Sequence, residues 1–257
     1  MRLRLPLLCA LASLLLSPAA ARSQTNGQLW GELLLERVKD SRLTYILDLE
    51  PKILVSAPAG APGWWALDIT PAVNWVASNW LDLTGEVLTA YTKQTDNISS
   101  FELTERLGAR FHVFSRELPT LVEERLARAE RPARRRVVLR DYLRIEQRNL
   151  FYAGTKPDSS AWRLRNRLEL EYPLNRERVS ADGATYVLND WEWYIPLNGD
   201  ADERFANKQR IRVGLGHRRN LRWSFEALYI WGRSRNTIGQ PYTTSDNIVD
   251  IRVKRVF

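Results

Sequence analysis

Charged side chains recur at every second position in several segments of this sequence, and they are the residues best suited to bind ions or to take part in chemistry. The segment WRLRNRLELEY, residues 162–172, holds its charges in one row: Arg163, Arg165, Arg167, Glu169 and Glu171. Successive side chains of a β-strand point to opposite faces. As a strand, the segment therefore has one charged face and one apolar face, which Asn166 interrupts.

Two functions fit such rows of charge. Arginine rows favour anionic solutes in a channel, whereas buried arginine–glutamate pairs can fill a narrow interior if every charge has its partner. The sequence leaves both interpretations open. The predicted interior-lining residues are Arg106, Arg110, Arg140, Arg144, Glu146, Arg148, Arg163, Arg165, Arg167, Glu169, Glu171, Asp190, Glu192, Arg210 and Arg212.

Catalytic chemistry has weaker support in the sequence. A lipid hydrolase or acyltransferase would need a nucleophile beside a histidine base, and the chain has two histidines, His112 and His217. Ser224 follows His217 across a predicted turn, which is too loose a spacing to define a catalytic pair. We find no metal-ligand spacing and no phosphate-binding glycine loop, so we expect no enzyme activity, metal or cofactor.

The charged rows belong to alternating segments that recur along most of the chain. Each is about 10 residues long, which matches a tilted transmembrane strand, whereas soluble strands are commonly nearer to about 5 or 6. Aromatic residues stand at the ends of several apolar faces, as in the two interfacial girdles of a membrane barrel. The segments are 29–36, 43–50, 65–75, 81–91, 101–113, 139–151, 162–172, 186–195, 208–215, 221–231 and 249–257.

The connections between these segments fall into two groups. KDSR, ASNW and HRRN are short, whereas AGTKPDSS, PLNGDADE and RSRNTIGQPYTTSD are long. Short periplasmic turns and longer outer loops are typical of outer-membrane barrels. We therefore predict an all-β fold, an antiparallel transmembrane β-barrel with an interior that favours small anionic solutes if it is open. A secreted soluble β-barrel with its apolar faces turned inward, around an apolar ligand, is the alternative.

The strand count conflicts with this prediction. Bacterial single-chain barrels usually have an even number of strands, and the alternating segments number eleven. We expect about 12 strands (10–12), with a further strand hidden in the insert or one segment that does not span. The last segment ends in Val253 and Phe257 on one face, which resembles the C-terminal signal that the barrel-insertion machinery reads, and Arg255 interrupts this face.

The N-terminus has the order of a secretory signal peptide. Arg2 and Arg4 precede an apolar run from Leu5 to Leu16, and small residues follow at Ala19 to Ala21. We predict a cleaved signal at residues 1–21, export through the Sec pathway and a barrel domain at residues 22–257. The single cysteine, Cys9, lies in this signal, so the predicted mature chain needs no disulfide.

A basic insert interrupts the alternation at residues 115–136. Its sequence is SRELPTLVEERLARAERPARRR, with helix-forming residues first and three consecutive arginines last. It is either a mobile solvated turn or a helix that lies on a membrane surface, because basic segments attract anionic lipid head groups. The sequence does not decide between these two roles.

The charge of the whole chain is moderately basic, with a formal net charge of +8. These charges are spread through the alternating segments, and an exported protein with this pattern is not expected to bind nucleic acid. The expected partners are outer-membrane lipids, periplasmic chaperones, the barrel-insertion machinery and small anionic solutes. The expected location is the outer membrane of a Gram-negative bacterium.

The assembled segments also carry a family resemblance. QLWGELLLERVKDSRLTYILDLEPK, LRIEQR followed by WRLRNRLELEY, and QRIRVGLGHRR resemble an uncharacterised family of bacterial outer-membrane barrels, domain of unknown function DUF2490. The resemblance spans nearly all of the predicted mature chain, and the basic insert departs from it. It implies the barrel fold and the outer-membrane location, and it implies no established activity.

Overall fold

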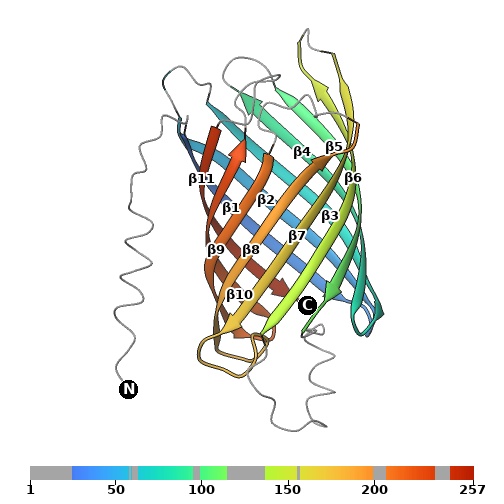
Figure 1. Cartoon of the computed structure of the whole chain (residues 1–257), viewed down its shortest axis with the longest axis vertical. Helices are drawn as coiled ribbons and strands as arrows, with labels where there is room; N and C mark the ends of the chain where they lie inside the picture. Colours follow the sequence, from blue (N-terminus) through green and yellow to red (C-terminus); the bar gives the residue numbers. More distant parts are fainter. Residues whose placement is uncertain are drawn as a thin grey trace.

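The computed structural model describes residues 25–57, 59, 63–94, 99–114, 137–154, 157–198, 207–234 and 244–257. These residues form a closed barrel of eleven tilted strands (Figure 1). The all-β prediction is confirmed. The strands are β1 (Thr25–Val38), β2 (Leu43–Ser56), β3 (Trp64–Ser78), β4 (Leu81–Gln94), β5 (Ser100–His112), β6 (Val138–Tyr152), β7 (Ser159–Pro173), β8 (Ala184–Pro196), β9 (Asn207–Asn220), β10 (Trp223–Ser234) and β11 (Thr244–Val256).

The barrel closes through one parallel pair, which corrects the expected count of about twelve strands. β1 and β11 run side by side in the same direction, in register from Thr25 and Ser245 to Glu36 and Val256. Every other neighbouring pair is antiparallel. An odd number of strands can close only if one pair is parallel. This pair hydrogen-bonds both edges, so the barrel needs no twelfth strand.

The alternating side chains sort into an apolar outer face and a polar inner face. On β3, Trp65 is 46 % exposed and Trp75 is 44 % exposed on the outside. Between them in the alternation, Thr70 and Asn74 are buried. This distribution is the reverse of a soluble barrel with an apolar interior, because here the large apolar side chains contact the surroundings.

Strand direction places the connections at two ends of the barrel. The β1–β2, β3–β4 and β9–β10 turns lie at the end that β11 reaches, together with the longer connections 113–137 and 174–183. The opposite end carries the connections 57–63, 95–99, 153–158, 197–206 and 235–243. Short and long connections are therefore only partly separated. The predicted signal, 1–21, and the insert, 115–136, lie outside the described residues.

None of the described residues forms a helix long and apolar enough to cross a bilayer. That finding does not bear on crossing by strands.

Candidate functional site: the charged interior

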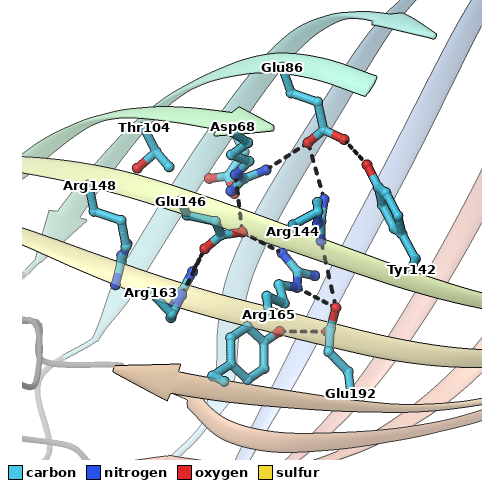
Figure 2. Close-up of polar contacts among 12 residues, drawn as sticks. Asp68, Glu86, Thr104, Tyr142, Arg144, Glu146, Arg148, Arg163, Arg165 and Glu192 are labelled. Carbon is cyan, nitrogen blue, oxygen red and sulfur yellow. Dashed lines mark hydrogen bonds and ion pairs between the residues drawn. The ribbon is translucent and has the colours of Figure 1, made fainter. Parts of the chain in front are cut away.

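The interior contains a continuous network of arginine and glutamate side chains, drawn in part in Figure 2. Its first centre is Glu146 on β6, whose side chain is fully buried. Arg163 lies 2.5 Å from one carboxylate oxygen, and Arg106 and Arg165 lie 3.4 Å and 3.5 Å from the other. Three guanidinium groups on β5 and β7 thus surround one carboxylate.

Glu192 on β8 is the second centre and is also fully buried. Arg165 contacts one of its oxygens, and Arg212 on β9 contacts the other at 2.6 Å. The Tyr194 hydroxyl donates a hydrogen bond to this second oxygen at 2.6 Å. Because Arg165 contacts both Glu146 and Glu192, it joins the two centres (Figure 2).

Glu86 extends the network to β4. Arg144 and Arg106 lie 3.1 Å and 3.6 Å from its Oε2 atom, and the Tyr142 hydroxyl donates to its Oε1 atom at 2.6 Å. Arg144 also lies 3.7 Å from Glu192. The network therefore runs without a break from β4 to β9. Removing one carboxylate from it would leave buried guanidinium groups with fewer and more distant partners, which is costly.

Smaller groups of ion-paired residues occupy the rest of the interior side of β5–β9. Arg148 donates two hydrogen bonds to Glu102, at 2.9 Å and 2.7 Å. Glu169 pairs with both Arg167, at 2.5 Å, and Arg140, at 3.0 Å. Arg140 also contacts Glu171, and Arg212 also contacts Asp190.

The structure places all the predicted lining residues on the inner face. Thirteen of them line an interior cavity of about 400 Å³. The other two, Glu146 and Glu192, are buried behind it against the arginines. The residues of the cavity wall are Arg106, Arg110, Arg140, Arg144, Arg148, Arg163, Arg165, Arg167, Glu169, Glu171, Asp190, Arg210 and Arg212.

Two arginines of the cavity wall form no close ion pair with a carboxylate of the described residues; Glu169 acts on Arg110, and Glu50 and Glu192 act on Arg210, only at longer range. The guanidinium of Arg110 lies over the Tyr142 ring, 4.6 Å from its centre. Arg210 lies 4.9 Å from the centre of the Trp30 ring and 5.4 Å from that of Tyr194. Aromatic faces attract such cations but do not neutralise them, so the positive charge at these two positions is less closely compensated than that of the ion-paired arginines.

The facing wall is acidic, and our prediction of lining residues missed it. Glu32, Glu50 and Asp68, on β1, β2 and β3, line the same cavity. Lys52 contacts Glu50 at 2.8 Å and Asp68 at 2.6 Å, and Arg252 contacts Glu32 at 2.8 Å. The alternation in residues 30–36 and 44–52 was the signal that would have found them.

Asp48, on the same acidic wall, has no hydrogen-bond or ion-pair partner among the described residues. The cavity therefore has an acidic side around β1–β3 and a basic side around β5–β9. Acidic and basic side chains are nearly balanced across the two sides, so the interior is bipolar.

Apolar side chains close parts of the barrel above and below the charged network. Trp30, Leu228, Ile230 and Ile248 form one buried cluster. Val138, Tyr186 and Val179 form a second. Val179 belongs to the connection 174–183 and is only 1 % exposed, so this connection folds into the turn end of the barrel.

Polar residues interrupt the apolar outer face at a few positions. Asn166, the one polar residue on the apolar face of WRLRNRLELEY, donates a hydrogen bond to Asp141 on β6 at 2.6 Å. These two side chains satisfy each other on the outside of the barrel. Glu105 on β5 and Gln147 on β6 are outward-facing cross-strand neighbours.

Neither histidine lies beside Ser224 in the described structure, and the one hydroxyl that contacts a histidine, that of Thr185, lies on the outer face. His112 lies 2.8 Å from Asp82 on the inner face, and His217 lies 3.1 Å from the Thr185 hydroxyl on the outer face. Ser224 is buried on the inner face of β10, opposite Arg218 in the register. The described residues also hold no cluster of three or more ligands for a metal ion.

The C-terminal residues seal the parallel pair. Val253 lies opposite Leu33 of β1, and the backbone N–H of Phe257 donates to the Glu36 carbonyl at 2.8 Å. Arg255, which interrupts the outward apolar face, lies over the rings of Phe257 and Trp223 at 4.4 Å and 5.0 Å. Its guanidinium is therefore held against aromatic surface.

Comparison with known proteins identifies the family of the chain. No curated protein matches the chain. Residues 66–243, more than half of the chain, match the family described as "Protein of unknown function (DUF2490)". The matched region runs from β3 to the connection after β10 and includes the whole basic wall of the cavity. The chain therefore belongs to the DUF2490 family.

Proposed function

We propose that this protein is an integral outer-membrane β-barrel of a Gram-negative bacterium, in which the ion-paired interior serves as a closed structural core. The observation that carries the proposal is the inverted distribution of side chains. Apolar residues such as Leu29, Ile53 and Trp65 are nearly half exposed on the outside, whereas the interior is charged. Lipid covers such an outer face, and a closed barrel leaves no backbone group unpaired in the bilayer.

A bilayer would also remove the free-energy cost of the apolar outer face. Apolar surface exposed to water costs about 25 cal/mol per Å², and here the exposed side chains lie on all strands. A soluble barrel that binds an apolar ligand would need the opposite arrangement, with an apolar cavity. The cavity of this barrel is lined mainly by arginine, lysine, glutamate and aspartate, so we do not propose that function.

Closure of the interior follows from its contacts. Glu146 and Glu192 each bind several guanidinium groups, and Val179 fills the turn end against Val138 and Tyr186. Movement of a solute through this network would separate buried ion pairs, which is costly. We infer a barrel with little or no steady conductance.

A small channel for anionic solutes is the second candidate. It is favoured by Arg110 and Arg210, which line the cavity without a close carboxylate partner among the described residues. Arginine rings favour anions in pores. The acidic wall at Glu32, Asp48 and Asp68 opposes a simple anion preference, so the selectivity would depend on the path along the basic wall.

Conductance in a planar lipid bilayer tests the two candidates directly. The refolded mature chain is inserted, and currents and reversal potentials are recorded in a salt gradient. Silence from a barrel shown to be inserted supports the closed core. Discrete steps with anion preference would overturn the closed core in favour of the channel, and a chain that stays soluble without detergent would overturn both.

Export and assembly complete the proposal. We infer that residues 1–21 direct export through the Sec pathway and are removed, and that periplasmic chaperones and the barrel-insertion machinery act on the chain. Recognition of the last strand rests on Val253 and Phe257. A lipid hydrolase or acyltransferase has no comparable support, because no described serine lies beside His112 or His217.

A further inference from the structure

The outer face over β4–β7 carries an outward-facing carboxylate near its middle. Glu105 lies in the central part of β5 and is exposed on the outside. Its cross-strand neighbour on β6 is Gln147. Neither side chain has a hydrogen-bond or ion-pair partner among the residues that the structure describes.

This pair is costly if it faces lipid alone. A carboxylate in the hydrocarbon region is rare, and it usually marks a contact or a functional site. An unpaired amide in lipid also loses its hydrogen bonds to water. The outward acid of β6, Asp141, lies near the start of that strand and already accepts a hydrogen bond from Asn166. Across the strands Glu105 has only Val87 and Gln147 as neighbours, and one amide cannot fill the acceptor positions of both carboxylate oxygens. The pair thus needs further groups from outside the chain.

The shape beside them is a knob next to a hollow. Leu107, two residues after Glu105, is 68 % exposed. Its neighbour on β4 is Gly85, around which a Cβ atom would meet nothing within 4 Å. The protruding leucine and the open glycine therefore lie side by side, one row from the polar pair.

We propose that this surface, defined by Gly85, Glu105, Leu107 and Gln147, binds a second copy of the same chain in the membrane. Two barrels inserted in the same direction are related by an axis along the membrane normal, so each residue meets residues at its own depth. Such a contact is isologous: residue i meets residue j, and j meets i.

Both features of the surface suit that symmetry. The Gln147 amide of each copy donates to the Glu105 carboxylate of the other, which gives two equal hydrogen bonds. The Leu107 side chain of each copy packs over Gly85 of the other, because small residues let membrane segments approach closely. Outward basic residues such as Lys93 and Arg255 lie toward the strand ends. Glu105 of one copy therefore finds no basic side chain at its own depth on another copy.

The proposal rests on the proposed membrane location, and it is tested with the refolded mature chain in detergent micelles and in bilayers. Sedimentation equilibrium and energy transfer between labelled copies give the dissociation constant. We expect a dimer. Gln147→Glu brings like charges together and should weaken association at least about tenfold. The exchanged variant, Glu105→Gln with Gln147→Glu, should restore it.

A steric pair of variants provides the matched control. Gly85→Phe fills the hollow and should abolish the dimer, whereas Ala227→Phe adds the same ring to the exposed outer face of β10 and should leave association unchanged. Resistance of the folded barrel to detergent denaturation, before and after heating, verifies that every variant is folded.

The outcomes separate the inference from the function on which it rests. A chain that fails to insert into bilayers contradicts the proposed membrane location. An inserted barrel that is monomeric, or whose association ignores Gln147→Glu and Gly85→Phe equally, contradicts the dimer surface and leaves the membrane proposal intact. Association that depends on another protein in native membranes also overturns the self-contact.

Discussion

Phe257 and Glu36 meet at the seam of the barrel, where the backbone N–H of Phe257 donates to the Glu36 carbonyl at 2.8 Å. The contact lies at the end of a parallel register that begins at Thr25 and Ser245. The first and last strands are thus joined up to the final residue. The same residues that are proposed to guide insertion also close the structure.

Removal of Phe257 should affect assembly more than stability. The folded barrel loses one backbone hydrogen bond, worth about 1 kcal/mol net, together with one exposed aromatic ring. The free energy of unfolding of the refolded barrel, measured in urea, should therefore fall by about 1 kcal/mol. Insertion into vesicles that carry the barrel-insertion machinery should fall much further, and Phe257→Trp should restore it. Equal effects in both assays would contradict a recognition role.

Glu192→Gln should strongly destabilise the barrel. The carboxylate is fully buried and contacts Arg165 and Arg212, and loss of one partner from a buried ion pair costs about 3–5 kcal/mol. Urea unfolding measures the loss. Glu36→Gln is the control, because its pair with Lys254 is more accessible to water, at 16 % and 33 % exposed, and the loss should be nearer to the value of about 1 kcal/mol for exposed pairs. Similar losses in the two variants would mean that the network does not act as a buried core.

Shortening the connection 174–183 should open the turn end of the interior. Deletion of residues 176–182 removes Val179 from its contact with Val138 and Tyr186 and joins Asn175 to Gly183, a dipeptide favoured in tight hairpins. We expect bilayer currents that are larger and more frequent than those of the native chain. A deletion variant that is folded, inserted and still silent would show that the charged network alone closes the barrel.

The shortened barrel provides the background for a selectivity measurement. In it, Arg110→Gln together with Arg210→Gln should lower the anion-to-cation permeability ratio obtained from reversal potentials. These two arginines line the cavity without a close carboxylate partner among the described residues. Arg255→Gln, on the outer face, should leave the ratio unchanged. A ratio that is insensitive to Arg110 and Arg210 would place the ion path elsewhere.

Much of the strand structure could be predicted from alternation alone. The segment 162–172 became β7, Ser159–Pro173, and its arginines and glutamates do face inward. A period of two residues is a local property, and one charged face opposite one apolar face determines which side is inside. The ion pairs between strands then follow from strand neighbours, since Glu146 lies directly opposite Arg163 in the register.

The parallel seam could not be predicted in this way. The alternation along β1 and β11 is the same whether the two strands are parallel or antiparallel to each other. Their pairing also joins residues more than two hundred positions apart. The expectation of an even count came from other barrels, and it is wrong for this chain. Direction at the seam depends on whether the strand count is odd or even, because eleven strands joined by successive antiparallel connections leave the first and the last running the same way.

The position of Val179 and the outer polar residues were missed for different reasons. Val179 lies in a connection without periodicity, so its burial depends on tertiary contacts with Val138 and Tyr186. Glu105, Asp141 and Gln147 were visible in the sequence as breaks in apolar faces. Their regular neighbours dominated the pattern, although such breaks are where contacts with other molecules are expected.

The parallel seam also limits how the chain could be rewired. In a barrel with an even number of strands the two termini emerge at the same rim, so a short peptide can join them and new termini can be cut elsewhere. Here Thr25 and Val256 lie at opposite rims, because β1 and β11 run the same way. Any peptide that joined them would have to run the length of the barrel, through the occupied interior or along its outer face. Circular permutation, which even barrels permit in principle, is therefore closed to this fold.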